Sequence, residues 1–373
     1  AVTLEAMGAA VIGCNCSGGP DELQQVVAEL SQYTELPLVV QPNAGLPLLV
    51  DGKVQYPLKA EEFAKTMQRF LPYEVAFMGG CCGTTPQHIA CLKAAVQNHV
   101  LRSRRVEPLG RLSCREFVVE IGGNTLPKMI GERINPTARK KLAQGLRDGD
   151  LAMIEKEAEQ QVEAGAHVLD VNVGTHGIDE TQVMADVLTL LQQSTSIPLC
   201  LDSTNPQVLE RGLKQYQGKA LINSVNGEQA SLDNILPLAK RYGAAVVGLT
   251  LDETGIPPKA EGRLEIAKRI VAACEQHGMR HARIVDFERQ KIHFWVFGGR
   301  GNNVFALAGA DFHNQRIGIA PRFRNIRLVE HQIVSHVKGA FTCIDIQKIG
   351  IGMGIPCAPQ ACVEPGGTAH EGK

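Results

Sequence analysis

The sequence predicts an α/β protein made of the C-terminal part of one (β/α)8 barrel and a second, largely (β/α)8-type barrel with an atypical C-terminal segment. Three observations support this prediction. The 373 residues are enough for two domains. Short apolar runs alternate with helical patterns along most of the chain. Asp and Asn residues follow several of these runs, at the strand ends where such barrels carry their sites.

Composition excludes several classes of protein. No apolar run approaches the ~18 residues that a membrane span needs. The formal net charge of −1 gives no reason to expect a nucleic-acid or membrane partner. Eleven cysteines without a visible secretory signal are typical of reduced thiols and metal ligands, so we expect a cytoplasmic protein. The chain begins without Met, in what resembles the end of a helix, and we expect a fragment.

Residues 1–106 form the first predicted module. Strands are expected at 9–13, 38–41 and 75–78, with helices between them. Pro20 begins one helix and Thr85 caps another. Residues 107–127 follow an arginine-rich stretch and are expected to form an inter-domain linker or, in an equivalent description, a solvated surface loop.

Residues 128–281 show the alternation more clearly and predict the second module. Strands are expected at 129–134, 168–173, 198–201, 220–223, 245–249 and 283–286. Gly165 and Gly243 stand where helices end before the next strand. Five or six βα units in series favour a barrel over a doubly wound sheet. Residues 282–373 differ in composition, contain the only Trp and predict no architecture.

Polar residues end successive strands of the second module and predict a binding pocket at its catalytic face. They are Arg133, Asn135, Asp170, Asn172, Asp202, Ser203, Asn223, Asn226 and Asp252. In the alternative interpretation, these Asp and Asn side chains only cap the helices that follow.

The first module carries cysteines at two strand ends, in Gly13-Cys14-Asn15-Cys16-Ser17 and Gly79-Gly80-Cys81-Cys82-Gly83. Three converging thiolates would make a zinc site with an open fourth position, where an exogenous thiol becomes a nucleophile. Cys14 and Cys16 would share one face of a strand, so spacing favours neither. The alternative for the vicinal pair is a buried pair or a strained disulfide. Four further cysteines fit core positions: Cys91, Cys114, Cys200 and Cys274.

Seven motifs carry a resemblance to known modules. Three of them resemble the homocysteine S-methyltransferase module: Gly-Cys-Asn-Cys-Ser-Gly-Gly-Pro (13–20), Gln-Pro-Asn-Ala-Gly-Leu-Pro (41–47) and Gly-Gly-Cys-Cys-Gly-Thr-Thr-Pro (79–86). Four resemble the methyltetrahydrofolate-binding module: Ile-Gly-Glu-Arg-Ile-Asn-Pro-Thr (130–137), Leu-Asp-Val-Asn-Val-Gly (169–174), Leu-Cys-Leu-Asp-Ser-Thr (199–204) and Ile-Asn-Ser-Val-Asn (222–226). In this order the two modules are similar to the front half of cobalamin-dependent methionine synthases.

The resemblance implies a function and a set of residues. It implies methyl transfer from 5-methyltetrahydrofolate through cobalamin to zinc-bound homocysteine, with homocysteine and folate as small-molecule partners. The implied zinc ligands are Cys16, Cys81 and Cys82, which decides against Cys14. Asp202 and Asn223 would hydrogen-bond the pterin ring, with Asp170, Asn172 and Asn135 in the same pocket. A carboxylate suits this task because it accepts from a ring N–H and an amino group together.

Several departures from the family pattern limit what the resemblance implies. The first barrel begins near the sixth strand of the family. Asp286 is only a weak counterpart of a later pterin contact, and a further Asn has no match. From about residue 282 the resemblance ends, as a frameshift would produce. Arg316 replaces the Gly of the family's cobalamin motif in the segment 311–316. We therefore expect cobalamin to come from another domain or protein.

Two rival functions remain on sequence grounds. One is a methyltetrahydrofolate:corrinoid protein methyltransferase that uses only the second module, and the three cysteines argue against it. The other is a non-catalytic remnant that binds pterin or zinc, which the missing strands of the first barrel favour.

Overall fold

A computed structural model describes the chain except for residues 108, 123–124, 280–281, 285–295, 299–303 and 308–373. The described residues lie in the first of two units, Ala1–His313. Asp286, the segment 311–316 and most of the predicted tail 282–373 are outside the described residues. Among the described helices, none is long and apolar enough to cross a membrane.

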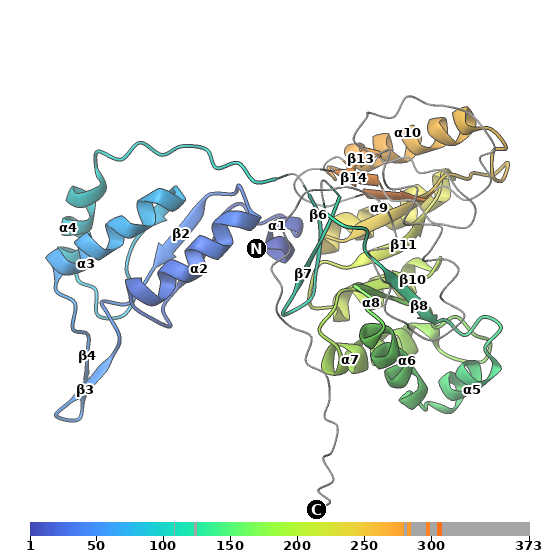
Figure 1. The fold of residues 1–373 in the computed structure, drawn as a ribbon, viewed down its shortest axis with the longest axis horizontal. Coiled ribbons are helices and arrows are strands. Elements are labelled where there is room, and N and C mark those ends of the chain that lie inside the picture. The colour runs from blue at the N-terminus through green and yellow to red at the C-terminus, as the bar shows by residue number, and fades with distance from the viewer. Residues whose placement is uncertain (108, 123–124, 280–281, 285–295, 299–303, 308–373) are drawn as a thin grey trace, which may run out of the picture. The chain divides into compact units, whose positions relative to one another are not determined.

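A parallel sheet with the order β1-β2-β5 forms the centre of the first module (Figure 1). The elements of this module are α1 (Val2–Ala6), β1 (Ile12–Asn15), α2 (Pro20–Tyr33), β2 (Leu38–Gln41), β3 (Leu48–Val50), β4 (Lys53–Gln55), α3 (Ala60–Met67), the 3-10 helix η1 (Gln68–Tyr73), β5 (Val75–Met78) and α4 (Pro86–Val96). Helix α2 begins at Pro20 as expected, and the Glu22 carboxylate accepts the Gly19 N–H at 2.8 Å, which satisfies an N–H at the helix start.

The core of the first module lies between its sheet and helices. The buried side chains include Val27 of α2, Val40 of β2, Phe63 and Met67 of α3, and Leu92 of α4. Because these residues come from three helices and the central strand, packing of the helices holds the sheet in a fixed position.

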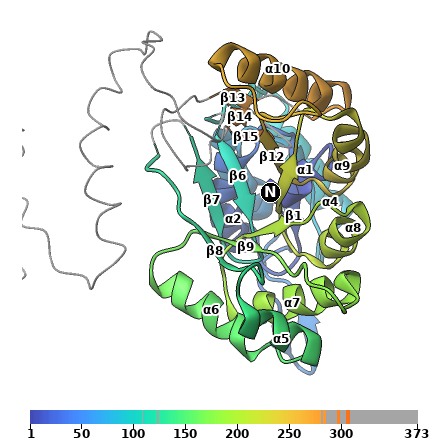
Figure 2. The ribbon, with the colours of Figure 1, turned by 90° about the vertical axis from the view of Figure 1, so that its right-hand side faces the viewer.

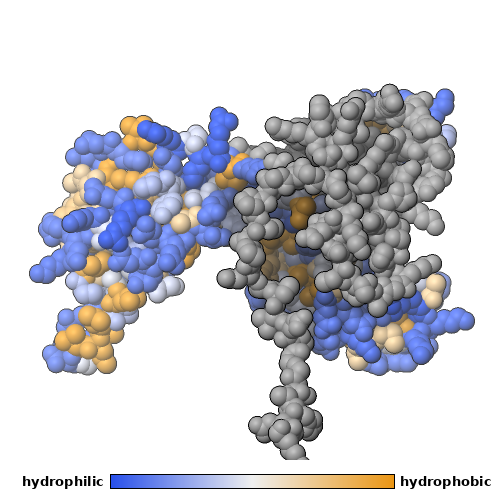
Figure 3. All heavy atoms as spheres, in the orientation of Figure 1, coloured by the Kyte–Doolittle hydropathy of each residue, from blue (hydrophilic) through white to orange (hydrophobic). Residues whose placement is uncertain are grey.

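The β3–β4 hairpin is the exposed part of this module. Asp51 and Gly52 both have positive φ at its turn, 50° and 74°, as a two-residue hairpin loop requires. Apolar side chains gather on the hairpin (Figure 3), where Leu49 is 76% and Val54 62% exposed. The hairpin therefore adds little to the core.

The second module contains six parallel strands in the order β15-β12-β11-β10-β9-β8, and the predicted α/β class is confirmed. The elements are β6 (Gly110–Ser113), β7 (Val118–Ile121), β8 (Ile130–Ile134), α5 (Lys140–Asp148), α6 (Ala152–Glu163), β9 (Val168–Val171), α7 (Glu180–Ser194), β10 (Leu199–Asp202), α8 (Pro206–Gln215), β11 (Leu221–Val225), α9 (Gln229–Tyr242), β12 (Ala245–Leu249), α10 (Ala260–Gln276), β13 (Ala282–Ile284), β14 (Val296–Gly298) and β15 (Val304–Leu307). The strand expected at 283–286 corresponds to β13, which pairs antiparallel with β14 and is not part of the parallel sheet.

Side chains alternate between two layers of this module. Leu169 and Val171 of β9 face a core shared with helices such as α7, whereas Val168 belongs to a separate inner cluster. Figure 2 shows helices α6–α9 following the outer side of the sheet. Both faces of the strands are covered, which explains their nearly continuous apolar sequences.

Residues 107–127 are more than the linker that the sequence predicts, because they contain the antiparallel hairpin β6–β7. Leu112 of this hairpin is fully buried in the inner cluster with Val168 and Leu221. Ser113 and Lys219 exchange backbone hydrogen bonds of 3.1 and 3.0 Å. The hairpin therefore packs at the amino-terminal ends of the sheet strands. Its strands are too short for a clear alternating pattern.

We predict that Tyr216→Phe destabilises the fold through this hairpin contact. The buried Tyr216 hydroxyl donates to the Ser113 carbonyl at 2.8 Å and accepts from the Leu199 N–H at 3.2 Å. Its removal should lower the free energy of unfolding by about 1–3 kcal/mol in urea titrations. Tyr242→Phe is the control, because that hydroxyl contacts the partly exposed Glu210. Equal losses in both variants would contradict the prediction.

Candidate functional site

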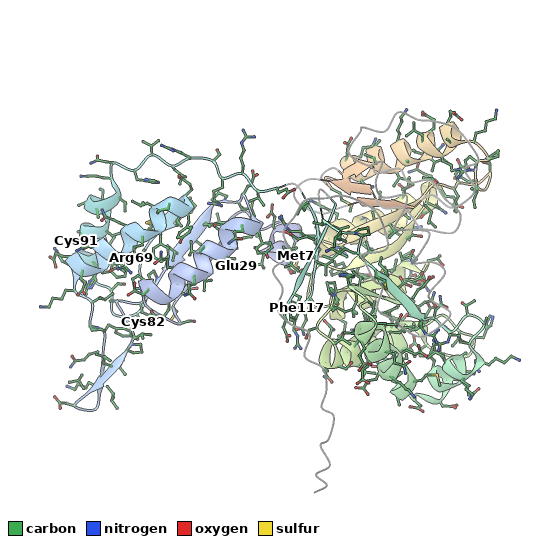
Figure 4. The ribbon with its side chains drawn as sticks, viewed as in Figure 1. Met7, Glu29, Arg69, Cys82, Cys91 and Phe117 are labelled. Atoms are coloured by element: carbon green, nitrogen blue, oxygen red, sulfur yellow. The ribbon has the colours of Figure 1, made fainter. Side chains whose placement is uncertain are left out.

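Three cysteine thiols from two strand ends converge in the first module. The Cys82 sulfur lies 3.9 Å from the sulfurs of both Cys16 and Cys81, and the three atoms are within 4.8 Å of one another. Figure 4 labels Cys82, near the stem of the β3–β4 hairpin. Thiolates bound tetrahedrally at Zn–S distances of ~2.3 Å would have sulfurs about 3.8 Å apart. The spacing and the donor set therefore fit a zinc ion.

The backbone decides that Cys16, and not Cys14, joins this cluster. Strand β1 ends at Asn15, and Cys16 and Ser17 have positive φ values of 56° and 57°. The alternation that would place both cysteines on one face therefore stops before Cys16. Cys14 stays half-buried against the apolar core. The expectation of a shared face is wrong for this reason.

Two residues that the sequence analysis did not assign support the thiol cluster. The Asn43 side-chain oxygen accepts the Cys82 N–H at 3.1 Å, and Asn43 is only 5% exposed. Gly83 has a φ of 78°, and a Cβ there would lie 2.3 Å from Tyr56 side-chain atoms, so only glycine fits. Asn43 lies in the quoted 41–47 motif, but its pairing with Cys82 spans 39 residues and leaves no local pattern.

Ionisation of one of the three thiols disfavours ionisation of the others. A hydrogen bond from the Ser17 backbone, followed by those from Cys81 and Cys82, holds the pKa of Cys16 below its usual range. Burial, followed by its hydrogen bonds to Cys16 and Cys82, raises the pKa of Cys81. A hydrogen bond to Cys82 is the first cause of a raised pKa at Tyr56. A cation among the sulfurs would remove this competition, because it favours every thiolate at once.

A second cluster of polar side chains lies at the strand ends of the second module. The Asn172 amide donates to Asp202 at 2.9 Å, and the Asn223 amide donates to Asp170 at 3.2 Å. Asp202 and Asn223 are neighbours across β10 and β11. The structure thus brings together four of the five residues that the resemblance assigns to the pterin pocket.

The other Asn and Asp residues at these strand ends close turns and do not cap helices, because the N-cap residues of α5, α9 and α10 are Arg139, Glu228 and Lys259. Asn135, Asn226 and Asp252 accept backbone N–H groups two residues further along the chain, at 2.9, 3.0 and 3.1 Å. Asn135 therefore makes a local turn and does not join the hydrogen bonds of the cluster. Asn172 combines both roles, since its oxygen also accepts the Gly174 N–H.

Glu132 is a third carboxyl of this site that the sequence analysis did not single out. Its negative charge contributes to the raised pKa values of both Asp170 and Asp202. The pairing of β8 with β9 shifts register between Gly131 and Ile134. A simple alternation of side chains could not assign Glu132 to the inner face, because an irregularity of this kind changes the direction of the residues beside it.

Burial dominates the electrostatics of the second cluster. Asp170 is 2% exposed, and burial, followed by the charge of Asp202, raises its pKa to about 7. Burial is also the first cause of the raised pKa of Asp202. Among the described residues, Oδ1 of Asp202 and the side-chain oxygen of Asn223 accept no hydrogen bond. The cluster therefore suits a ligand that presents N–H donors.

Comparison with known families matches both modules. Residues 1–96 match the family model described as homocysteine S-methyltransferase, and residues 131–299 match the one described as pterin binding enzyme. Among solved structures, a dihydropteroate synthase from Xanthomonas albilineans matches with 19% identity and a TM-score of 0.34, covering 45% of this chain and 60% of that chain.

Curated relatives match across the module boundary. The methionine synthase of Mycobacterium tuberculosis is 35% identical over 274 residues, and that of Mycobacterium leprae is 34% identical over 284 residues. Each alignment covers 72% of this chain and 23% of the relative, so the chain spans about a quarter of their length.

These matches identify a homocysteine S-methyltransferase domain in residues 1–96 and a pterin-binding domain in residues 131–299. Both curated relatives are methionine synthases, and the resemblance to part of such a synthase that was inferred from the motifs is confirmed.

The raised pKa of Asp170 predicts a pH-dependent stability. Asp170 keeps its proton in the folded state up to about pH 7, whereas the unfolded state releases it near pH 4, so folding loses stability as pH rises between these values. The free energy of unfolding of Asp170→Asn, taken relative to that of wild type, should rise by on the order of 2–4 kcal/mol between pH 4 and pH 8. Urea titrations at four pH values would measure this difference. Asp51→Asn, in the exposed hairpin turn, is the control. A constant difference for Asp170→Asn would contradict the prediction.

Proposed function

We propose that this chain takes part in methyl transfer from 5-methyltetrahydrofolate, through cobalamin, to zinc-activated homocysteine, with methionine and tetrahydrofolate as products. The observation that carries the proposal is the convergence of the Cys16, Cys81 and Cys82 sulfurs at zinc-like spacing. The names of the curated relatives agree with it. Cobalamin would be supplied by another domain or protein.

In the thiol half of the reaction, Cys16, Cys81 and Cys82 would hold the zinc and leave its fourth position for homocysteine. Bound zinc lowers the pKa of a coordinated thiol and keeps it as a thiolate nucleophile at neutral pH. Asn43 fixes the backbone of Cys82 through its hydrogen bond. Gly83 allows Tyr56 to pack closely beside the ligands.

In the folate half of the reaction, Asp202 and Asn223 would accept hydrogen bonds from the pterin ring. Asn172 holds the Asp202 carboxylate at 2.9 Å and so orients its other oxygen. Transfer of the methyl group requires N5 of the folate to be protonated or strongly hydrogen-bonded, because an unprotonated N5 would have to leave as an amide anion. The pKa of about 7 at Asp170 supports a cluster that holds a proton near neutral pH.

The proposal includes a cytoplasmic setting. Eight cysteines of the described residues are unpaired, as is typical of reducing compartments. The rival corrinoid-protein methyltransferase would need only the second cluster, and it leaves the three converged thiols without a role. A pterin- or zinc-binding remnant would keep both clusters but show no turnover.

The zinc assignment predicts that the purified chain contains one zinc ion and that Cys16→Ser loses most of it. Removal of one of three thiolate ligands should lower the zinc content to below about 0.1 per chain after dialysis against a weak chelator, measured by elemental analysis. Cys91→Ser is the matched control, since this cysteine lies in α4 outside the cluster. A wild-type chain without zinc would refute the thiol-activation proposal.

The pterin assignment predicts that Asp202→Asn and Asn223→Ala weaken binding of 5-methyltetrahydrofolate. Each variant removes an acceptor for ring N–H groups, and we expect the Kd from calorimetry to rise by about tenfold or more. Asp252→Asn is the control, because Asp252 makes a local turn and contacts Arg269. Unchanged affinity in both test variants would remove the assignment.

A further inference from the structure

Asp170 occupies an unusual position for a residue expected to contact a ligand. Its side chain is 2% exposed, and its Oδ1 accepts the Asn223 amide at 3.2 Å. Its Oδ2 is buried and has no hydrogen-bond partner among the described residues. In the strand pairing, Asp170 lies beside Cys200, which is itself buried. The Asp170 side chain therefore lies deeper in the module than the Asn223 side chain, which it contacts.

The surroundings of Asp170 disfavour an ionised carboxylate. The titratable groups that face it are Glu132 from β8 and Cys200 and Asp202 from β10, and none of them is a cation. β11 contributes only the neutral amide of Asn223. A buried anion that has only neutral donors and two neighbouring acids is costly, and a protonated carboxyl avoids that cost.

We propose that Asp170 is a positioning residue that, as a neutral acid, fixes the orientation of the Asn223 amide. Because the Nδ2 group of Asn223 donates to Asp170, the side-chain oxygen of Asn223 becomes the atom presented to the ligand. This inference rests on the proposed function of the second module. It replaces the expectation that Asp170 itself binds the pterin.

In the neighbouring pair, Asn172 and Asp202, the roles of the two residue types are exchanged: the Asn orients the Asp. There the Asn172 amide holds the Asp202 carboxylate and leaves the Oδ1 of Asp202 for the ligand. The two Asn–Asp pairs together present two acceptors side by side on β10 and β11. A flipped Asn223 amide would replace one acceptor with a donor, which would repel the N–H edge of a pterin. Asp170 therefore sets the hydrogen-bonding character of the site without touching the ligand.

A double-mutant cycle between Asp170 and Asn223 tests this role. The full chain is titrated with 5-methyltetrahydrofolate by calorimetry, as wild type and as Asp170→Ala, Asn223→Ala and the double variant. If Asp170 acts through Asn223, Asp170→Ala weakens binding by about tenfold in wild type and by less than about twofold in Asn223→Ala. Asp170→Ser serves in place of Asp170→Ala if the latter unfolds, because the serine hydroxyl is too short to reach Asn223.

The conservative variant separates positioning from charge. Asp170→Asn keeps a neutral carbonyl acceptor for the Asn223 amide, so its Kd should recover to within about threefold of wild type.

The outcomes distinguish the two proposals. Additive effects in the cycle, or a loss in Asp170→Asn equal to that in Asp170→Ala, would overturn the role of Asp170 while leaving the pterin site in place. A wild-type chain that does not bind 5-methyltetrahydrofolate would overturn both.

Discussion

Both sites depend on one geometric constraint, which is that the carboxyl ends of parallel strands meet at the same edge of a sheet. In the first module, Cys16 follows β1 and the Cys81-Cys82 pair follows β5, with β2 between these strands. In the second module, Asp170, Asp202 and Asn223 come from three neighbouring strands. Residues separated by 21 to 66 positions therefore meet without any local signal, because the register of the strands fixes their distances.

The two clusters present opposite electrostatic problems. Three thiols within 4.8 Å of one another cannot all ionise without a cation. In the second module, Asp170 and Asp202 have no cationic partner among the described residues, and burial raises the pKa of both carboxyls, to about 7 at Asp170. A metal in the first module and protons in the second would suit the two partners of the proposed methyl transfer, since the thiol must become a nucleophile and the folate amine a leaving group.

The motifs contain most residues of the two candidate clusters. The contact that each residue makes, however, could be read only from the backbone of the folded chain. Cys81 and Cys82 could be recognised because they are vicinal and lie among glycines. Asn43 could not, because its contact with Cys82 is long-range and passes through the main chain. Asn135 carried the same strand-end signature as Asp202, yet its side chain closes a turn. A strand-end position alone does not distinguish a turn from a pocket.

The sequence by itself determined the α/β class, the two modules and the chemical types gathered at their strand ends, since these follow from periodicity and composition. The resemblance already favoured Cys16 over Cys14, and the tertiary structure supplies the physical reason, because the chain leaves the strand conformation at Asn15 and turns through positive φ. It also placed Asp170 beneath Asn223, because depth in a barrel depends on strand register and on what packs below. Such choices depend on contacts between distant segments, which a local pattern does not encode.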